Sequence, residues 1–247
     1  MATPVWIGSG WKMTKRRDEA LDFARRLAAG PADPRIQRMV FPPFTLLREI
    51  KAALAGTGVL VGAQTMHWED DGAWTGEISA PMLVDCGTDL VELGHSERRR
   101  HFGETDDTIA LKVAAALRHG LQPVVCVGET AAQQQEADAV LARQVAAAVS
   151  MAGQDAPVMF AYEPVWAIGE GGEPATPGYA DARHERIKVV AADRLGVPPL
   201  VFYGGSVNAG NCAELIVQRN VDGLFIGRAA WTVEGYWDIL RRVSAVL

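Results

Sequence analysis

The chain has 247 residues, of which 49% are hydrophobic and 22% are charged, and its formal net charge is −6 at pH 7. This length and hydrophobic content suit either two small domains or one large α/β barrel. An acidic chain without long basic clusters argues against a nucleic-acid-binding surface, and no hydrophobic run approaches the roughly 20 residues that span a bilayer.

Short apolar runs alternate with helical segments along the whole chain. The strand candidates are VWIG (5–8), MVFPP (39–43), VLVGA (59–63), LVELG (90–94), PVVCVG (123–128), VMFAYEP (158–164), LVFYGG (200–205) and GLFIG (223–227). Each is almost continuously hydrophobic. This pattern is typical of parallel strands that are covered on both faces.

Helix signals fill the segments between these strands. Thr130 and Gln133 form a capping box before an alanine-rich run that ends near Met151, and Thr105 precedes the amphipathic segment IALKVAAALRH, which stops at Gly120. Further helices are expected near residues 15–29, 44–55, 79–85, 179–195, 209–219 and 233–246. Eight strands alternating with eight helices, with no linker, predict a single (β/α)8 barrel domain over residues 1–247. A doubly wound sheet is the alternative.

Active sites of such barrels are built from the loops that follow the carboxyl ends of the strands. At those ends the sequence places Lys12, Gln64, His95, Glu129, Glu163, the turn Gly204-Gly205-Ser206 and the turn Gly227-Arg228. One amine, one imidazole and one carboxylate are therefore expected to meet at one rim.

Each of these three side chains also has a plainer structural explanation. Lys12 could be a solvent-facing charge, but the adjacent Trp11 and the absence of neighbouring charges in the sequence favour a partly enclosed amine that meets an anion. His95 could be a structural histidine, but at the start of a helix the unpaired N–H groups favour a neutral imidazole. Glu163 lies in the apolar segment AYEPVWAIG, which suits a general base better than a surface carboxylate.

The two glycine turns follow consecutive strands, and glycine lets the backbone approach a ligand closely. Loops in these positions commonly hold a phosphate in such barrels. Together with Lys12 across the rim, the turns predict a phosphate site.

Cysteine and histidine spacing indicates no metal site. Cys86, Cys126 and Cys212 show no CxxC spacing, and the histidines show no HExxH pattern. Cys126 is interpreted as a small buried side chain without a neighbouring base. The N-terminal segment MATPVWIGSG lacks the features of a signal peptide. We expect a cytoplasmic protein without metal or cofactor.

A set of motifs resembles the triosephosphate isomerase family in order along nearly the whole chain. They are WKM (11–13), GAQ (62–64), GAWTGEIS (72–79), LGHSERR (93–99), FGETD (102–106), CVGET (126–130), YEPVWAIG (162–169), YGGSV (203–207) and DGLFIG (222–227). The resemblance implies an isomerase that interconverts a phosphorylated ketose and aldose through an enediolate. In it Glu163 is the base, His95 polarises the substrate oxygens, and Lys12 stabilises the enediolate and the phosphate.

The resemblance also implies roles for supporting residues. Ser96 and Glu97 hold the framework of the site. Residues 164–176 resemble the closing loop of the family, in which the N–H of Gly169 meets the phosphate; Ser206, Gly227 and the backbone of Arg228 complete the phosphate site. The loop of residues 64–79, with Trp74 and Thr75, corresponds to a loop that enters the other subunit, so a homodimer is implied.

Several positions depart from the family pattern. Gly10 replaces an asparagine before Trp-Lys, Arg228 replaces a second glycine, and the closing loop is one residue longer. These features are more similar to the paralogues that act on four-carbon erythrulose phosphates. Gly10 would then be a substrate-size determinant that leaves room for an extra hydroxymethyl group, in an enzyme of erythritol breakdown. Alternatively, water fills that space and the substrate is a triose phosphate of glycolysis and gluconeogenesis.

Two other classes remain open on sequence grounds. The chain could be a catalytically silent paralogue that binds phosphate, because a fold does not determine a function. It could also be a barrel synthase or aldolase that forms a Schiff base at Lys12, which would require a desolvated lysine.

Overall fold

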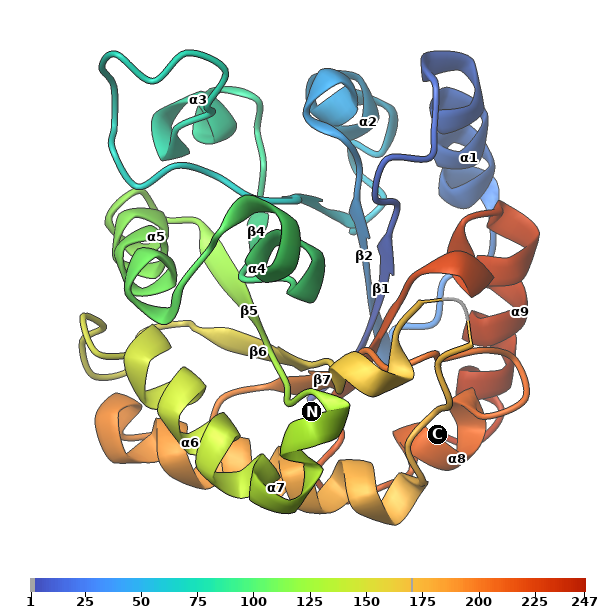
Figure 1. The fold of residues 1–247 in the computed structure, drawn as a ribbon. Helices are drawn as coiled ribbons and strands as arrows, with labels where there is room; N and C mark the ends of the chain where they lie inside the picture. Colours follow the sequence, from blue (N-terminus) through green and yellow to red (C-terminus); the bar gives the residue numbers. More distant parts are fainter. Residues whose placement is uncertain (1–2, 170) are drawn as a thin grey trace.

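The computed structural model describes residues 3–169 and 171–247, whose strands form a closed barrel. Neighbouring strands are parallel throughout, and the last strand pairs with the first. The strands are β1 (Val5–Gly10), β2 (Ile36–Phe41), β3 (Leu60–Ala63), β4 (Leu90–Leu93), β5 (Gln122–Val127), β6 (Met159–Tyr162), β7 (Val201–Tyr203) and β8 (Gly223–Ile226). The predicted (β/α)8 barrel is confirmed (Figure 1).

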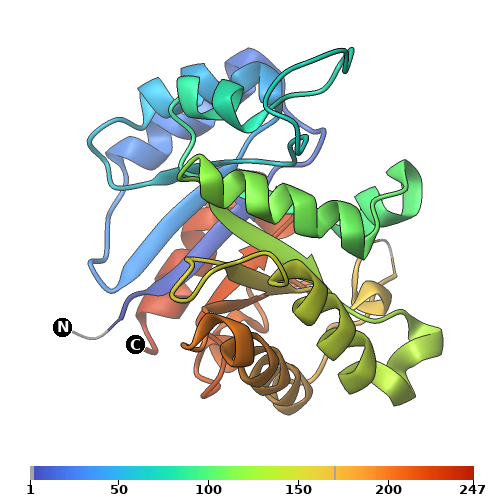
Figure 2. The same cartoon turned by 90° about the vertical axis from the view of Figure 1, so that its left-hand side faces the viewer.

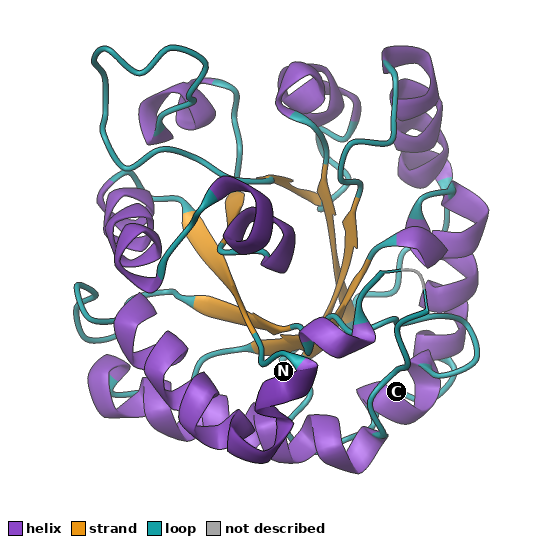
Figure 3. Ribbon diagram, in the orientation of Figure 1, coloured by secondary structure: helices purple, strands orange, loops and turns teal. Residues whose placement is uncertain are grey.

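Helices surround the barrel on its outer side (Figure 3). The α-helices are α1 (Arg17–Ala29), α2 (Leu47–Ala53), α3 (Ala80–Asp85), α4 (Ser96–Phe102), α5 (Asp106–Arg118), α6 (Ala137–Ala148), α7 (Pro177–Leu195), α8 (Cys212–Ile216) and α9 (Val233–Ser244). Short 3-10 helices are η1 (Phe44–Leu46), η2 (Ala131–Glu136), η3 (Val165–Ala167) and η4 (Arg228–Ala230). Among the described residues no helix is long and apolar enough to cross a bilayer.

The segment after β4 contains two helices, α4 after His95 and α5 after Thr105, whereas the predicted pattern of eight helices allowed one. Gly103 ends α4 in the left-handed conformation, with φ at 69°. Two residues later the side chain of Thr105 accepts the N–H of Thr108 and starts α5. A second difference concerns residues 131–136, which follow the predicted cap at Thr130 and form the 3-10 helix η2 before α6 begins.

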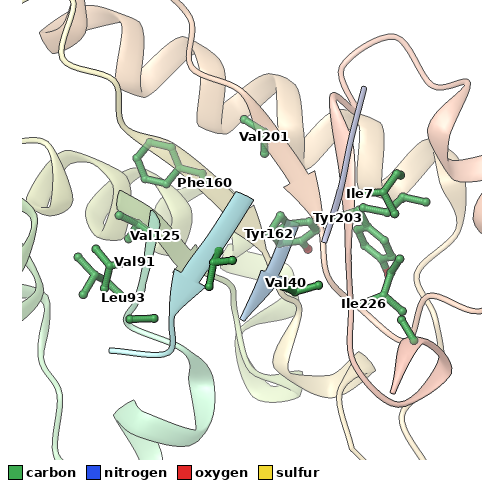
Figure 4. Close-up of a cluster of buried hydrophobic side chains, with 14 of the residues drawn as sticks. Ile7, Val40, Val91, Leu93, Val125, Phe160, Tyr162, Val201, Tyr203 and Ile226 are labelled. Atoms are coloured by element: carbon green, nitrogen blue, oxygen red, sulfur yellow. The ribbon is translucent and has the colours of Figure 1, made fainter. Parts of the chain in front are cut away.

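The hydrophobic core has two layers, one inside the barrel and one between strands and helices. Figure 4 shows the outer layer, which includes Val91 and Leu93 of β4. The barrel interior holds Met39, Phe41, Leu90, Val124, Cys126, Met159, Ala161, Phe202 and Phe225. Because side chains alternate between the two faces of a strand, Glu92 points into the barrel, as Leu90 does. A carboxyl group therefore lies inside an apolar barrel.

Two glycines make room for aromatic rings inside the barrel. A Cβ added to Gly62 would lie 2.3 Å from the Phe41 ring, and one added to Gly8 would lie 2.7 Å from the Phe225 ring. Phe41 and Phe225 meet edge to face, with ring centroids 4.9 Å apart. The barrel is thus filled between its two ends. The start of β1 and the end of α9 lie at the same end of the barrel (Figure 2).

Candidate active site

A cavity of about 720 Å³ opens where the strands end. It brings together most of the polar residues that the sequence placed at the rim. The residues from that set that line the cavity are Lys12, Gln64, His95, Glu163, Gly204, Ser206, Gly227 and Arg228. Gly10, Glu97 and Gly169, which the family resemblance singled out, line it too. Glu129 does not line it.

Lys12 lies two residues after the end of β1 and adopts a left-handed backbone conformation with φ at 49°. Gln64 supports this turn, since its Nε2 donates to the carbonyl of Lys12 at 2.9 Å. The ammonium Nζ donates to Oε1 of Glu97 at 2.6 Å. The sequence therefore missed an ion pair, because it showed no charge next to Lys12, whereas the fold places the first turn of α4 against it.

Glu97 stays ionised beside this amine. Burial alone would raise the pKa of its carboxyl, but the hydrogen bond from Lys12 and the nearby charges lower the pKa overall. The pair leaves 31% of the Lys12 side chain exposed. The ammonium therefore remains accessible to an anion in the cavity.

His95 lies at the N-terminus of α4, as the sequence predicted, and is buried. Its Nδ1 accepts the backbone N–H of Glu97 at 3.1 Å. Because Nδ1 is an acceptor, the proton of the neutral ring lies on Nε2. This nitrogen faces Oε2 of Glu163 at 3.6 Å. The imidazole can thus donate a hydrogen bond into the cavity.

Glu163 follows β6 and is 4% exposed. Two glycines hold it closely: a Cβ at Gly128 would lie 2.0 Å from the Glu163 carbonyl oxygen, and one at Gly204 would lie 2.8 Å from its Cγ. Within the described part of the chain, Oε2 is buried without a hydrogen-bond partner. A carboxylate oxygen with no partner is available to take a proton from a substrate carbon.

Glu129 lies beneath the loop after β6 and not in the cavity. Its carboxylate accepts hydrogen bonds from Tyr162 Oη at 3.0 Å, Trp166 Nε1 at 2.9 Å and Tyr179 Oη at 3.1 Å. Burial, together with the Glu129 charge, raises the pKa of Tyr162, so this hydroxyl remains a donor. The residue anchors the start of the loop, a function that the sequence motif CVGET did not reveal.

The residues expected at a phosphate line the cavity on the side of β6 to β8. Gly169 has a φ of 91°, and Ser206 has a φ of 49° and donates its hydroxyl to the carbonyl of Ala167. The Tyr203 hydroxyl accepts the N–H of Ala175 at 2.9 Å. Position 170 of the predicted closing loop lies outside the described residues. Gly227 and Arg228 follow β8, where η4 begins.

Gly10 ends β1 at the wall of the cavity. Its φ is not positive, so the backbone does not require glycine. An added Cβ would lie 3.6 Å from Cζ of Phe225, an ordinary contact. The absence of a side chain therefore leaves space in the cavity beside Phe225.

Glu92 is a cavity residue that the sequence analysis missed. It is 6% exposed, and the Cys126 thiol lies 3.6 Å from its Oε1. Burial raises the pKa of Glu92 to about 7, an effect to which the Glu163 carboxylate adds and which His95 opposes. The sequence feature that could have indicated Glu92 is a charged residue within the otherwise apolar strand segment LVELG.

The carboxylates of Glu92 and Glu163 and the His95 ring could together hold a cation. One donor atom from each lies within 4.8 Å of the others. Such a cation would occupy the atoms that proton transfer needs.

The long loop after β3 extends beyond the neighbouring helices (Figure 2). Trp74 is 47% exposed and packs on His67, with ring centroids 4.3 Å apart. Thr75 next to it is exposed. The loop therefore exposes part of the Trp74 ring to solvent.

Comparison with known proteins gives a consistent result. The family model described as triosephosphate isomerase matches residues 5–243. Relatives named L-erythrulose-1-phosphate isomerase include those of Rhizobium etli, 61% identical over 98% of this chain and 94% of the relative, and of Rhizobium meliloti, 59% identical over 98% of each. The relative of that name in Mesorhizobium japonicum is 58% identical over the full length of both chains.

Proposed function

This chain is an isomerase of the triosephosphate isomerase family, and we propose that its substrate is L-erythrulose 1-phosphate. The observation that carries the proposal is Oε2 of Glu163, which has no hydrogen-bond partner among the described residues and faces Nε2 of His95 in a cavity widened at Gly10. Full-length relatives that carry the name of this activity support the four-carbon substrate over a triose phosphate.

The proposed reaction moves a carbonyl group by one carbon. Glu163 takes the proton from C3 of the substrate, and the electron pair of that C–H bond forms the enediolate between C2 and C3. His95 donates hydrogen bonds to the two oxygens and moves the hydroxyl proton between them. The ammonium of Lys12 stabilises the negative charge as it develops. Glu163 then returns its proton to C2, which leaves the carbonyl on C3.

The length of the carbon chain decides whether the product is a ketose or an aldose. C3 of L-erythrulose 1-phosphate carries a further hydroxymethyl group, so the product of this shift is again a keto sugar phosphate. In a triose phosphate the corresponding carbon is terminal, and the product is an aldehyde. The same residues perform both reactions, and the cavity beside the reacting carbon decides between them.

The phosphate is held on the opposite side of the cavity. In the proposal Gly169, Ser206, Gly227 and the backbone of Arg228 surround it, and the loop of residues 164–176 closes over it. Closure excludes water and protects the enediolate from loss of phosphate. Ser96 and Glu97 hold the framework, and Glu97 positions the ammonium of Lys12.

The alternative functions would each require a different property of the same site. A triose phosphate isomerase would fill the space at Gly10 with water. A Schiff base at Lys12 needs a neutral amine, which the ion pair with Glu97 disfavours. A silent phosphate-binding paralogue would not need an unpartnered base beside a hydrogen-bond donor.

The proposal extends to assembly and location. The aromatic loop with Trp74 and Thr75 is proposed to pack on a second copy of the chain, which gives a homodimer. We place the enzyme in the cytoplasm, in breakdown of erythritol, with no metal or organic cofactor.

The deciding experiment compares kcat/KM of the purified protein on L-erythrulose 1-phosphate and on glyceraldehyde 3-phosphate, under the same conditions. A clear preference for the four-carbon sugar is expected. A preference for the triose would identify a divergent triosephosphate isomerase, and no turnover of either would indicate the silent paralogue.

A further inference from the structure

We propose that Glu92 recognises the terminal hydroxyl of the four-carbon substrate and so selects it over three-carbon sugar phosphates. The inference rests on the proposed function. It begins with an unusual placement, because Glu92 lies among the apolar side chains that fill the barrel, next to the reacting groups. A buried carboxyl group lowers the stability of the folded protein unless hydrogen bonds compensate for its lost hydration.

The protein provides few hydrogen bonds to the carboxyl group of Glu92. Within the described residues its hydrogen-bond partner is the thiol of Cys126, a weak donor, at 3.6 Å. The carboxyl group reaches the cavity, so a substrate can meet it there. A polar group that is buried, weakly paired and turned toward a cavity is typical of a site that binds a hydroxyl or amine of a ligand.

In the proposed orientation of the substrate, its unphosphorylated end lies next to Glu92. The phosphate lies toward the loops after β6 to β8, and the reacting carbons lie between Glu163 and His95. The fourth carbon must then extend past these two residues, away from the phosphate. One carboxylate oxygen each of Glu92 and Glu163 and one ring nitrogen of His95 lie within 4.8 Å of one another. The terminal hydroxyl, which is one C–C and one C–O bond from the reacting carbon, can reach Glu92.

Gly10 and Glu92 then have complementary functions. Gly10 leaves room in the cavity because it has no side chain, whereas Glu92 contributes a polar partner to the cavity lining. The carboxyl group accepts a hydrogen bond from the hydroxyl when ionised and donates one when protonated. A three-carbon substrate has no terminal hydroxymethyl group and would leave Glu92 without this partner. Sites that hydrogen-bond a substrate hydroxyl discriminate strongly against analogues that lack it.

The test uses Glu92→Gln, which keeps shape and hydrogen bonding, and Glu92→Leu, which removes both polar atoms. For each protein kcat/KM is measured on L-erythrulose 1-phosphate and on glyceraldehyde 3-phosphate. Glu92→Leu is expected to lower the ratio of these two values by at least about fivefold, and Glu92→Gln to lower it less. A smaller fall for Glu92→Leu, from equal losses on both substrates or from no loss, would overturn the proposal.

A second measurement does not require turnover. The inhibition constants of erythritol 4-phosphate and of glycerol 3-phosphate, which lack a carbonyl, are compared in wild type and Glu92→Leu with glyceraldehyde 3-phosphate as substrate. Wild type should bind the four-carbon inhibitor more tightly, and Glu92→Leu should lose that preference. No preference in wild type, or the same preference in Glu92→Leu, refutes recognition by Glu92. Failure of wild type to isomerise L-erythrulose 1-phosphate refutes the proposed function instead.

Cys126→Ala is the matched control, because it removes the thiol beside Glu92 and keeps the carboxyl group. Its substrate ratio should stay within about twofold of wild type. A change as large as that of Glu92→Leu would assign the effect to repacking of the barrel and would overturn the proposal.

Discussion

His95 and Glu163 face each other across the cavity, with Nε2 of the histidine 3.6 Å from Oε2 of the glutamate. They come from different strand ends, after β4 and after β6. The backbone N–H of Glu97 fixes the histidine as a donor at Nε2, and the glutamate oxygen has no partner among the described residues. A hydrogen-bond donor and a base are thus positioned on either side of one small space.

Glu163→Asp tests the base. The shorter side chain withdraws the carboxylate from the reacting carbon, so kcat should fall by about a hundredfold or more. The inhibition constant of inorganic phosphate should remain within about threefold of wild type, because the phosphate lies on the other side of the cavity. If kcat and phosphate binding fell together, Glu163 would not be the base.

Lys12→Met tests the ammonium. The substitution removes the positive charge from the cavity, and kcat/KM should fall by about a hundredfold or more. Glu97→Gln is the control: it keeps the amine and removes only its charged partner, so kcat/KM should fall by less than about tenfold. An equal loss in both variants would show that the ion pair, and not the ammonium, is required.

The sequence predicted the parts of the site that depend on strand order. Runs such as LVELG and AYEP mark strand ends, and their loops in a closed parallel barrel must meet at one end, which brought His95 and Glu163 together. It did not predict contacts set by side-chain direction. The ion pair of Lys12 with Glu97 needs the exact position of the α4 start, and the inward orientation of Glu92 needs the strand register. Both are properties of the closed barrel.

Gly10→Asn tests the space at the end of β1. Since the φ of Gly10 is not positive and an added Cβ meets Phe225 at an ordinary distance, the variant should fold. The new amide should occupy the space needed by the fourth carbon. We expect kcat/KM for L-erythrulose 1-phosphate to fall by about tenfold or more, while that for glyceraldehyde 3-phosphate changes by less than about threefold. Gly10→Ala should lie between wild type and Gly10→Asn.

Thr75→Arg tests the proposed dimer. A buried, unpaired charge at an interface is costly, so the variant should elute as a monomer in light-scattering chromatography at concentrations where wild type is a dimer. Glu69→Arg in the same loop controls for the added charge. A monomeric wild type, or a dimer that Thr75→Arg leaves intact, would contradict the assignment of this loop.

Glu92→Gln should change how stability depends on pH. An unfolded glutamate titrates near 4.5, whereas burial raises the pKa of Glu92 to about 7 in the folded protein. Between these values the unfolded chain releases the proton first, so the free energy of unfolding falls as pH rises and levels off above pH 7. Glu92→Gln lacks this decline.

Relative to wild type, the variant should therefore gain up to about 3 kcal/mol between pH 4.5 and pH 8. Urea unfolding at several pH values measures this difference, and Cys126→Ala, which retains the carboxyl group, should still show the decline. Parallel stability curves for wild type and Glu92→Gln would mean that Glu92 is ionised in the folded barrel at all these pH values. In that case it would meet the substrate only as a hydrogen-bond acceptor.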